Sequence, residues 1–214
     1  MTQEERIRCI VVDDDAIVRS ALASYVNSAS DMELIATCSN GAEAIQAARA
    51  NVVDVVLMDI RMPVLDGVEA TRQIRKQHPT THVLLLTSFD QDDSMIDALR
   101  AGAGGFLLKN EAPETILEAI RSVHSGSSVL TTEPLTRLVS ERKKPKAPQL
   151  DLSPRESDVL ALLCRAYSNA EIAAELVLSE STVKTHVSAV MNKLQVATRL
   201  QAVVRAYEMG LVDS

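Results

Sequence analysis

The stretch VDVVLMDIRMPVLDG, residues 53–67, decides the fold class of this chain. Its first part is an apolar run interrupted only by Asp54, as expected of a strand that is covered on both faces. Asp59 follows the run directly, so the strand carries a carboxylate at its carboxyl end. The stretch therefore predicts one strand of a parallel α/β sheet.

Short apolar runs alternate with helical patterns on both sides of this stretch, over the first ~125 residues. Asn40 is placed to cap one helix, and Pro113 stands in a first helical turn, where proline is tolerated. The alternation predicts an α/β fold, a flavodoxin-like, doubly wound, five-stranded parallel sheet whose ligand site lies beyond the carboxyl ends of the strands. Strands are expected at residues 9–12, 34–38, 53–58, 83–87 and 105–108, and helices near residues 16–28, 41–50, 67–77, 91–101 and 113–124.

The alternation breaks after Ser125, and the chain divides into three parts. An α/β domain is expected over residues 1–124. Residues 125–150 contain a short helical pattern at residues 133–141 and the basic run RKKPKAP, which indicates a partly helical linker. The remainder, residues 151–214, predicts an all-α domain of four helices.

Polar residues mark the ends of these four helices. Ser153 and Ser168 are each followed three residues later by glutamate, which is the capping-box pattern at a helix start. Ser179 is placed to cap a third helix, and a fourth spans about residues 197–209. Gly210 stands where a glycine that ends a helix is favoured.

The composition limits the classes of function. The 214 residues are 46% apolar, which is enough for one or two buried cores. The formal net charge of -7 argues against a protein wrapped broadly in nucleic acid, but is compatible with a small DNA-binding surface. The charge is uneven, with 11 basic and 19 acidic residues in 1–124, 5 and 2 in 125–150, and 6 and 8 in 151–214.

The cysteines and the N-terminus indicate a soluble, cytoplasmic protein without a membrane partner. Cys9, Cys38 and Cys164 lie far apart, in or beside apolar runs, and form no metal-ligand spacing, so we interpret them as reduced core residues. The N-terminus, MTQEERIR, lacks the apolar centre of a signal peptide. No apolar run reaches the ~20 residues of a membrane span.

Charged and polar side chains follow the expected strands. Asp13, Asp14 and Asp59 come after the first and third strands, Thr87 ends the fourth, and Lys109 follows the fifth. Carboxylate oxygens suit Mg²⁺, and a carboxylate can itself form an aspartyl phosphate, with an ammonium and a hydroxyl holding the phosphoryl oxygens. A single polar residue after a strand is often only a loop or cap residue. The five together favour a phosphoryl-transfer site.

The motifs VVDDD, MDIRMPVLDG, LLLTS and GFLLK resemble the receiver domain of bacterial response regulators, over about residues 7–124. The resemblance implies that a sensor histidine kinase phosphorylates Asp59. It implies Mg²⁺ ligation by Asp14, Asp59 and the backbone carbonyl of Arg61, with Asp13 supporting. The residues implied to contact the phosphoryl group or to form the switch are Thr87, Lys109, Phe106 and Ser88. Phe106 stands where the family more often has tyrosine.

A short helix, a turn and a longer helix in the last domain form a helix-turn-helix pattern. The apolar stripe of the longer helix, Val183, Val187, Val190 and Leu194, is core by its periodicity. Lys184, Thr185 and Ser188 point away from that stripe, in the part of such helices that enters the major groove. From these residues alone, the acidic domain is equally compatible with protein–protein contacts.

The segments LSPRE, SNAEIAAEL, LSESTVKTHVSAVMNKL and VATRLQAV resemble the LuxR-type helix-turn-helix domain, over about residues 149–209. With the receiver, they resemble the NarL/FixJ family. The resemblance implies that Lys184, Thr185 and Ser188 face the DNA bases. It implies that Thr182, Lys193 and Arg199 contact phosphate or support the recognition helix. Ala166 replaces the usual glycine before Ser168, so this helix end is expected to be built differently.

Together these patterns predict a two-component response regulator. Phosphorylation at Asp59 is expected to control dimerisation and binding to promoter half-sites on double-stranded DNA, with Mg²⁺ as cofactor. No enzymatic activity is expected beyond promotion of its own phosphorylation and dephosphorylation. Three alternatives are an adaptor that acts through protein contacts without DNA, an enzyme with a regulatory receiver, and a receiver that works without phosphate. The last domain shows no nucleophile–base constellation, and the complete set of polar residues at the strand ends disfavours the third alternative.

Overall fold

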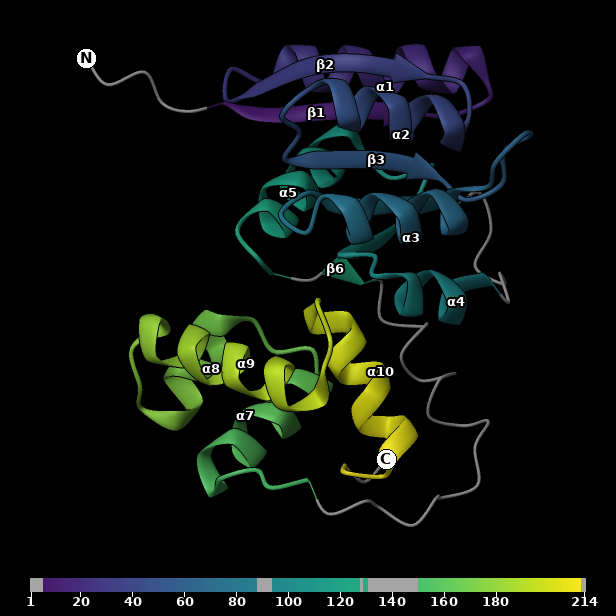
Figure 1. Cartoon of the computed structure of the whole chain (residues 1–214). Coiled ribbons are helices and arrows are strands. Elements are labelled where there is room, and N and C mark those ends of the chain that lie inside the picture. The colour runs from purple at the N-terminus through teal and green to yellow at the C-terminus, as the bar shows by residue number, and fades with distance from the viewer. Residues whose placement is uncertain (1–5, 88–93, 128, 131–149, 213–214) are drawn as a thin grey trace. The chain divides into compact units, whose positions relative to one another are not determined.

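The computed structural model describes residues 6–87, 94–127, 129–130 and 150–212. The chain divides into two compact units, Met1–Thr131 and Thr132–Ser214, and each is described by itself (Figure 1). Among the described residues, no helix has the length and apolar character needed to cross a membrane.

The first unit is built on one parallel sheet. Its strands are β1 (Ile7–Val12), β2 (Met32–Cys38), β3 (Val55–Asp59), β4 (His82–Thr87), β5 (Gly105–Leu108) and β6 (Val129–Leu130). They are ordered β2-β1-β3-β4-β5-β6, and every described pair is parallel. The expected five-stranded, doubly wound sheet is confirmed. β6 extends it at one edge, because Gly105 and Phe106 pair with two residues that the sequence pattern assigned to the linker.

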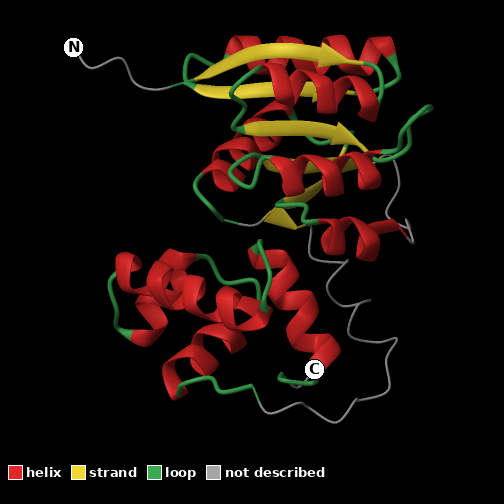
Figure 2. Ribbon diagram, in the orientation of Figure 1, coloured by secondary structure: helices red, strands yellow, loops and turns green. Residues whose placement is uncertain are grey.

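Helices cover both faces of this sheet (Figure 2). They are α1 (Ala16–Ser28), α2 (Gly41–Ala50), α3 (Gly67–Gln77), α4 (Ser94–Ala101) and α5 (Pro113–His124). α1 packs beside α5, and α3 packs between α2 and α4. Asn40 accepts the backbone N–H of Glu43 at the start of α2, as expected, and Asp66 accepts that of Glu69 in α3. α4 is described from Ser94; the expected helix began at residue 91, outside the described residues.

The core of the first unit lies between the sheet and the helices, and two of the cysteines belong to it. The central strand residues Val55, Leu57 and Leu84 are fully buried. Burial raises the pKa of Cys9 to about 12 and that of Cys38 to about 11. Both thiols are therefore protonated and unreactive at neutral pH, as the core interpretation predicts.

The second unit is all-α. Its helices are α7 (Pro154–Cys164), α8 (Asn169–Leu176), α9 (Glu180–Leu194) and α10 (Arg199–Met209), so the expected four helices are confirmed. Ser153 and Ser168 each form the expected capping box. Thr198 forms a third box, with Gln201, at the start of α10. The expected helical pattern at residues 133–141 lies outside the described residues.

A left-handed residue follows each of these four helices. The residues are Ala166, Val177, Gln195 and Gly210, with φ between 54° and 65°. In each case the next residue donates its N–H to the carbonyl five positions back, at 3.2 Å from Tyr167 to Leu162 in the first. This is the Schellman motif. The expectation that alanine at position 166 changes this helix end is therefore wrong, because the recovered hydrogen bonds outweigh a backbone cost of roughly 1–2 kcal/mol.

Candidate functional site

The carboxyl ends of the strands bring the predicted polar residues together. Asp13 follows β1, Asp59 ends β3, Thr87 ends β4 and Lys109 follows β5. β1, β3, β4 and β5 are consecutive neighbours in the sheet, so their ends form one edge. Asp13, Asp59 and Thr87 are buried, although all three are polar. Burial of this kind requires partners within the site.

Lys109 supplies the cation that these carboxylates need. Its Nζ lies 2.7 Å from Asp13 Oδ2 and 3.0 Å from Asp59 Oδ2. Burial raises the pKa of Asp59, and the hydrogen bond and charge of Lys109 oppose that rise. Burial lowers the pKa of Lys109, but hydrogen bonds and charges from Asp13 and Asp59 outweigh this and raise it overall. Lys109 is therefore charged and binds both acids at once.

The carboxylates also fit a divalent cation. Asp13, Asp14 and Asp59 each offer one oxygen, and these three oxygens lie within 4.8 Å of one another. Oxygen ligands of this kind suit Mg²⁺. Asp13 already accepts the backbone N–H of Asp15 at 3.0 Å and the ion pair from Lys109, whereas Asp14 is exposed. Asp13 and Asp59 both pair with Lys109, whereas Asp14 presents an exposed carboxylate to a cation.

Gly67 holds the start of α3 directly against the residue that ends β3. Its N–H donates to the carbonyl of Ile60 at 2.8 Å, and its own carbonyl accepts the hydroxyl of buried Thr71 at 2.6 Å. A Cβ at this position would overlap the carbonyl oxygen of Asp59 and lie 2.9 Å from its carbonyl carbon. Only glycine permits this approach, so Gly67 belongs to the structure that fixes Asp59. The sequence signal for this close approach was the pair Asp66 and Gly67, at the end of the loop that follows Asp59.

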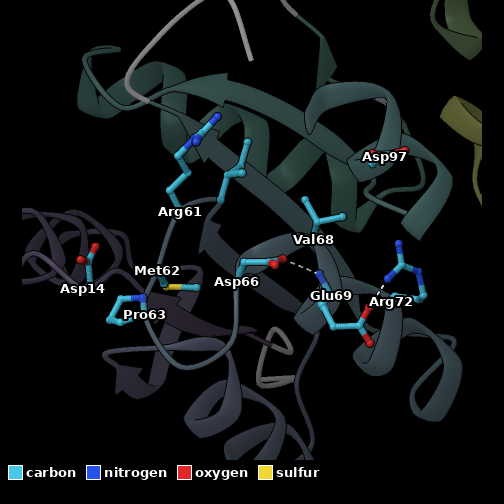
Figure 3. Close-up of a pocket in the computed structure, with 10 residues that line it drawn as sticks. Asp14, Arg61, Met62, Pro63, Asp66, Val68, Glu69, Arg72 and Asp97 are labelled. Atoms are coloured by element: carbon cyan, nitrogen blue, oxygen red, sulfur yellow. Dashed lines mark hydrogen bonds and ion pairs between the residues drawn. The ribbon is translucent and has the colours of Figure 1, made fainter. Parts of the chain in front are cut away.

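A pocket of about 610 Å³ opens beside the carboxylates and shares Asp14 with them (Figure 3). Arg61, Met62 and Pro63 of the β3–α3 loop form one side of it. The pocket thus opens onto the exposed carboxylate of Asp14 at the edge of the sheet. Its lining residues are Asp14, Ile60, Arg61, Met62, Pro63, Asp66, Val68, Glu69, Arg72 and Asp97.

The two expected switch residues lie on the neighbouring strands. Thr87 ends β4 at 4% exposure, and Phe106 in β5 is equally buried, with its ring directed away from solvent. Phe106 pairs with Leu85 across the two strands. Ser88, also expected to contact the phosphoryl group, lies outside the described residues.

The second candidate surface is the exposed side of α9. Val183, Val187, Val190 and Leu194 are buried, as the periodicity predicted. Lys184, Thr185 and Ser188 are exposed on the opposite side. The hydroxyls of Thr185 and Ser188 donate to backbone carbonyls four residues earlier, at 3.1 and 2.9 Å, which leaves their oxygens as acceptors. Lys184 is therefore the strongest outward-facing donor of the three.

The three weaker candidates have partners inside the domain. Thr182 Oγ1 lies 2.8 Å from the hydroxyl of Ser179, at the start of α9. Lys193 Nζ donates to Glu156 at 2.6 Å and so ties the end of α9 to the start of α7. Arg199 is 7% exposed and bonds to neutral oxygens of the α7–α8 region. Of the two roles expected of Arg199, its burial favours support of the neighbouring helices over direct phosphate contact.

Comparisons with known proteins agree with both units. Residues 9–121 match the model of the response regulator receiver domain, and residues 150–206 match that of bacterial regulatory proteins of the luxR family. The chain is 41% identical to the transcriptional regulatory protein LnrK of Bacillus subtilis, covering 96% of this chain and 98% of LnrK. It is 39% identical to the response regulator protein VraR of Staphylococcus aureus, over 97% of this chain and 99% of VraR.

A solved structure shows the same architecture. The response regulator ChrA of a heme-sensing two-component system is 33% identical, with a TM-score of 0.53, covering 97% of this chain and 99% of ChrA. The chain therefore belongs to the response regulators of two-component systems, as a transcription regulator that joins a receiver domain to a LuxR-type DNA-binding domain.

Proposed function

We propose that Asp59 accepts a phosphoryl group from a sensor histidine kinase in the cytoplasm, and that this modification controls dimerisation and sequence-specific DNA binding. The observation that carries the proposal is the double ion pair of Lys109, which holds Asp13 and Asp59 at one buried edge of the sheet. A structural lysine needs only one carboxylate partner. An ammonium shared by two buried acids, beside an open pocket, is suited to charge that changes during a reaction.

The chemistry is a displacement at phosphorus. A carboxylate oxygen of Asp59 forms a bond to phosphorus while the bond from phosphorus to the donor nitrogen breaks, and the donor histidine retains that electron pair. Mg²⁺, when bound, neutralises charge on the transferred phosphoryl oxygens. Asp14, Asp59 and the backbone carbonyl of Arg61 are the residues that would hold it, with Asp13 supporting. Lys109 stays within reach of the new phosphoryl oxygens because its Nζ already lies beside Asp59.

The switch follows from the change of charge at Asp59. An aspartyl phosphate carries more negative charge and more acceptor oxygens than the carboxylate it replaces. The phosphoryl group then competes with Asp13 for the ammonium of Lys109. Its oxygens also offer new hydrogen-bond acceptors to the hydroxyl of Thr87. Phe106 lies on β5, which pairs with β4, the strand that ends at Thr87, and leads into Lys109. Its ring is therefore the element whose position the phosphoryl group is proposed to bias.

Labelling tests the phosphorylation directly. With Mg²⁺ and a small phosphodonor, the chain is expected to gain one phosphate mass that hydroxylamine removes, and Asp59→Asn is expected to gain none. Asp66→Asn is the matched control, because Asp66 is an exposed acid on the same loop and asparagine retains its capping oxygen. Equal labelling of the wild type and Asp59→Asn would sink the proposal. Sedimentation of the labelled chain then measures dimerisation.

DNA binding is proposed through Lys184, Thr185 and Ser188 on the exposed side of α9, with a homodimer reading two half-sites. The competing function is a protein–protein adaptor, favoured by the six basic and eight acidic residues of 151–214. A promoter fragment is expected to bind with strong salt dependence, and Lys184→Ala is expected to abolish that binding. Lys76→Ala, an exposed lysine of α3, is the control and is expected to bind normally.

A further inference from the structure

Arg199 is a buried cation whose described partners carry no charge. It is the first residue of α10, directly after the N-cap Thr198. Its guanidinium donates to the side-chain oxygen of Asn169 at 2.8 Å and to the backbone carbonyl of Tyr167. Both acceptors are neutral oxygens. The positive charge is thus held inside the domain without a carboxylate among the acceptors that the structure describes.

The surroundings make this charge costly to the fold. Burial lowers the pKa of Arg199 to about 10, against smaller opposing contributions from Cys164 and Glu171. The carboxylate of Glu171 accepts the N–H of Ser168 at 2.7 Å, in the capping box of α8, and is committed there. Arg199 also lies in the first turn of its own helix, where the helix dipole disfavours a cation. The charge of the guanidinium thus adds a desolvation penalty that its two neutral acceptors offset less well than a carboxylate would.

We propose that Arg199 determines DNA affinity through space, by raising the electrostatic potential behind the DNA-facing surface without touching the nucleic acid. This rests on the DNA binding proposed above. In helix-turn-helix proteins the helix before the recognition helix crosses the phosphate backbone. Here that helix is α8, and Arg199 is bonded to its first residue, Asn169.

The position of the charge makes it effective. A charge inside a protein acts through a lower effective dielectric constant than water, and salt screens it less than an exposed charge. The domain has more acidic than basic residues, with 8 against 6 in 151–214. Lys193, one of its few other cations, is already paired with Glu156. Arg199 therefore adds to the attraction that exposed cations such as Lys184 exert on phosphates.

Asn169→Asp tests this inference, because it places a carboxylate on the existing acceptor and neutralises Arg199 without removing its anchor. The full chain is titrated into a short mixed-sequence DNA duplex, and binding is followed by fluorescence anisotropy at low and high salt. The variant is expected to melt at a higher temperature than the wild type and to bind about fivefold more weakly at low salt. Gln195→Glu, at an exposed position of the same domain, controls for the added negative charge and is expected to bind as the wild type does. An equal loss in both variants would overturn the inference.

If Arg199 only anchors the fold, the Asn169→Asp variant will be more stable and its DNA affinity will be unchanged or higher. That result overturns the inference. Arg199→Gln provides a second test that does not depend on the new carboxylate. It is expected to lose a similar factor of affinity, whereas Arg199→Lys retains most of it. If the wild-type chain shows no salt-dependent binding to the duplex with or without a phosphodonor, the proposed DNA binding itself fails, which is a separate outcome.

Discussion

The carboxyl edge of the receiver sheet and the exposed side of α9 differ in what occupies their charged groups. At the sheet edge, Lys109 binds Asp13 and Asp59, so the groups proposed to do the chemistry are each other's partners. On α9, Lys184 faces outward, whereas Lys193 is committed to Glu156 inside the domain. The proposed phosphorylation site is thus assembled by internal contacts. The proposed DNA-binding surface consists instead of side chains that point away from the core of the domain.

Replacing Lys109 tests the internal contacts most severely. Lys109→Met leaves Asp13 and Asp59 buried beside each other without their cation, and is expected to lower the free energy of unfolding by roughly 3 kcal/mol. Chemical denaturation of the full chain measures this. The double variant Lys109→Met/Asp13→Asn removes one of the two like charges and is expected to recover part of the loss. No recovery would mean that the lysine contributes through packing alone.

Gly67→Ala tests whether the sheet edge depends on close backbone packing. The new methyl group overlaps the carbonyl of Asp59, so unfolding is expected to become easier by roughly 2 kcal/mol and labelling of Asp59 slower. Gly105→Ala is the matched control, because its Cβ meets side chains of Leu84 and Val123 and no residue of the site. Denaturation and labelling rates are measured together. Labelling that slows equally in both variants would reduce Gly67 to a general packing role.

The left-handed helix ends allow substitutions that are expected to stabilise the DNA-binding domain rather than to destabilise it. Val177 is 89% exposed at φ 54°, and Ala166 is exposed at φ 62°, so neither side chain buries apolar surface in return for its strained backbone. Val177→Gly and Ala166→Gly are each expected to stabilise the domain by about 1 kcal/mol. Gly210→Ala, at the corresponding position of α10, is expected to destabilise it by a similar amount. Thermal melts of the full chain decide the signs.

The smallest effect expected is a change of titration at Glu156. The hydrogen bond from Lys193, followed by that from the backbone N–H of Ser153, lowers the pKa of Glu156 from 4.5 to about 2. A lowered pKa stabilises the folded domain above pH 4.5, and this contribution is lost as pH falls through about 2. The carboxyl carbon of Glu156, followed by NMR, is expected to titrate higher in Lys193→Met. Lys184→Met should leave the midpoint unchanged; movement in both would point to a general charge effect.

The sequence predicted the sheet edge well because strand ends are set by topology. Once Asp13, Asp59, Thr87 and Lys109 follow consecutive neighbouring strands, a parallel sheet must bring them together. The C-terminal contacts were harder, because residue type does not reveal burial. Arg199 is of a residue type that contacts phosphate, but it is buried and its guanidinium bonds within the domain.

Residue types also did not predict two details of the backbone, the strand β6 and the conformation of Ala166. β6 is only two residues long and has no periodicity of its own, since it forms by extending an existing edge. Ala166 adopts the conformation that its side chain disfavours, because two main-chain hydrogen bonds at 3.0 and 3.2 Å hold the chain there. Such positions follow from the hydrogen bonds of the finished helix rather than from local preference.

Three of the four helix ends in the DNA-binding domain therefore carry a residue other than the one their geometry favours. Where a substitution on the exposed side of α9 lowers the folding stability of the domain, a change at a distant helix end can compensate for it. Glycine at positions 166, 177 or 195 can restore that stability without altering Lys184, Thr185 or Ser188. The domain thus contains a reserve of compensating substitutions, which widens the set of recognition sequences that mutation can reach while the fold is kept.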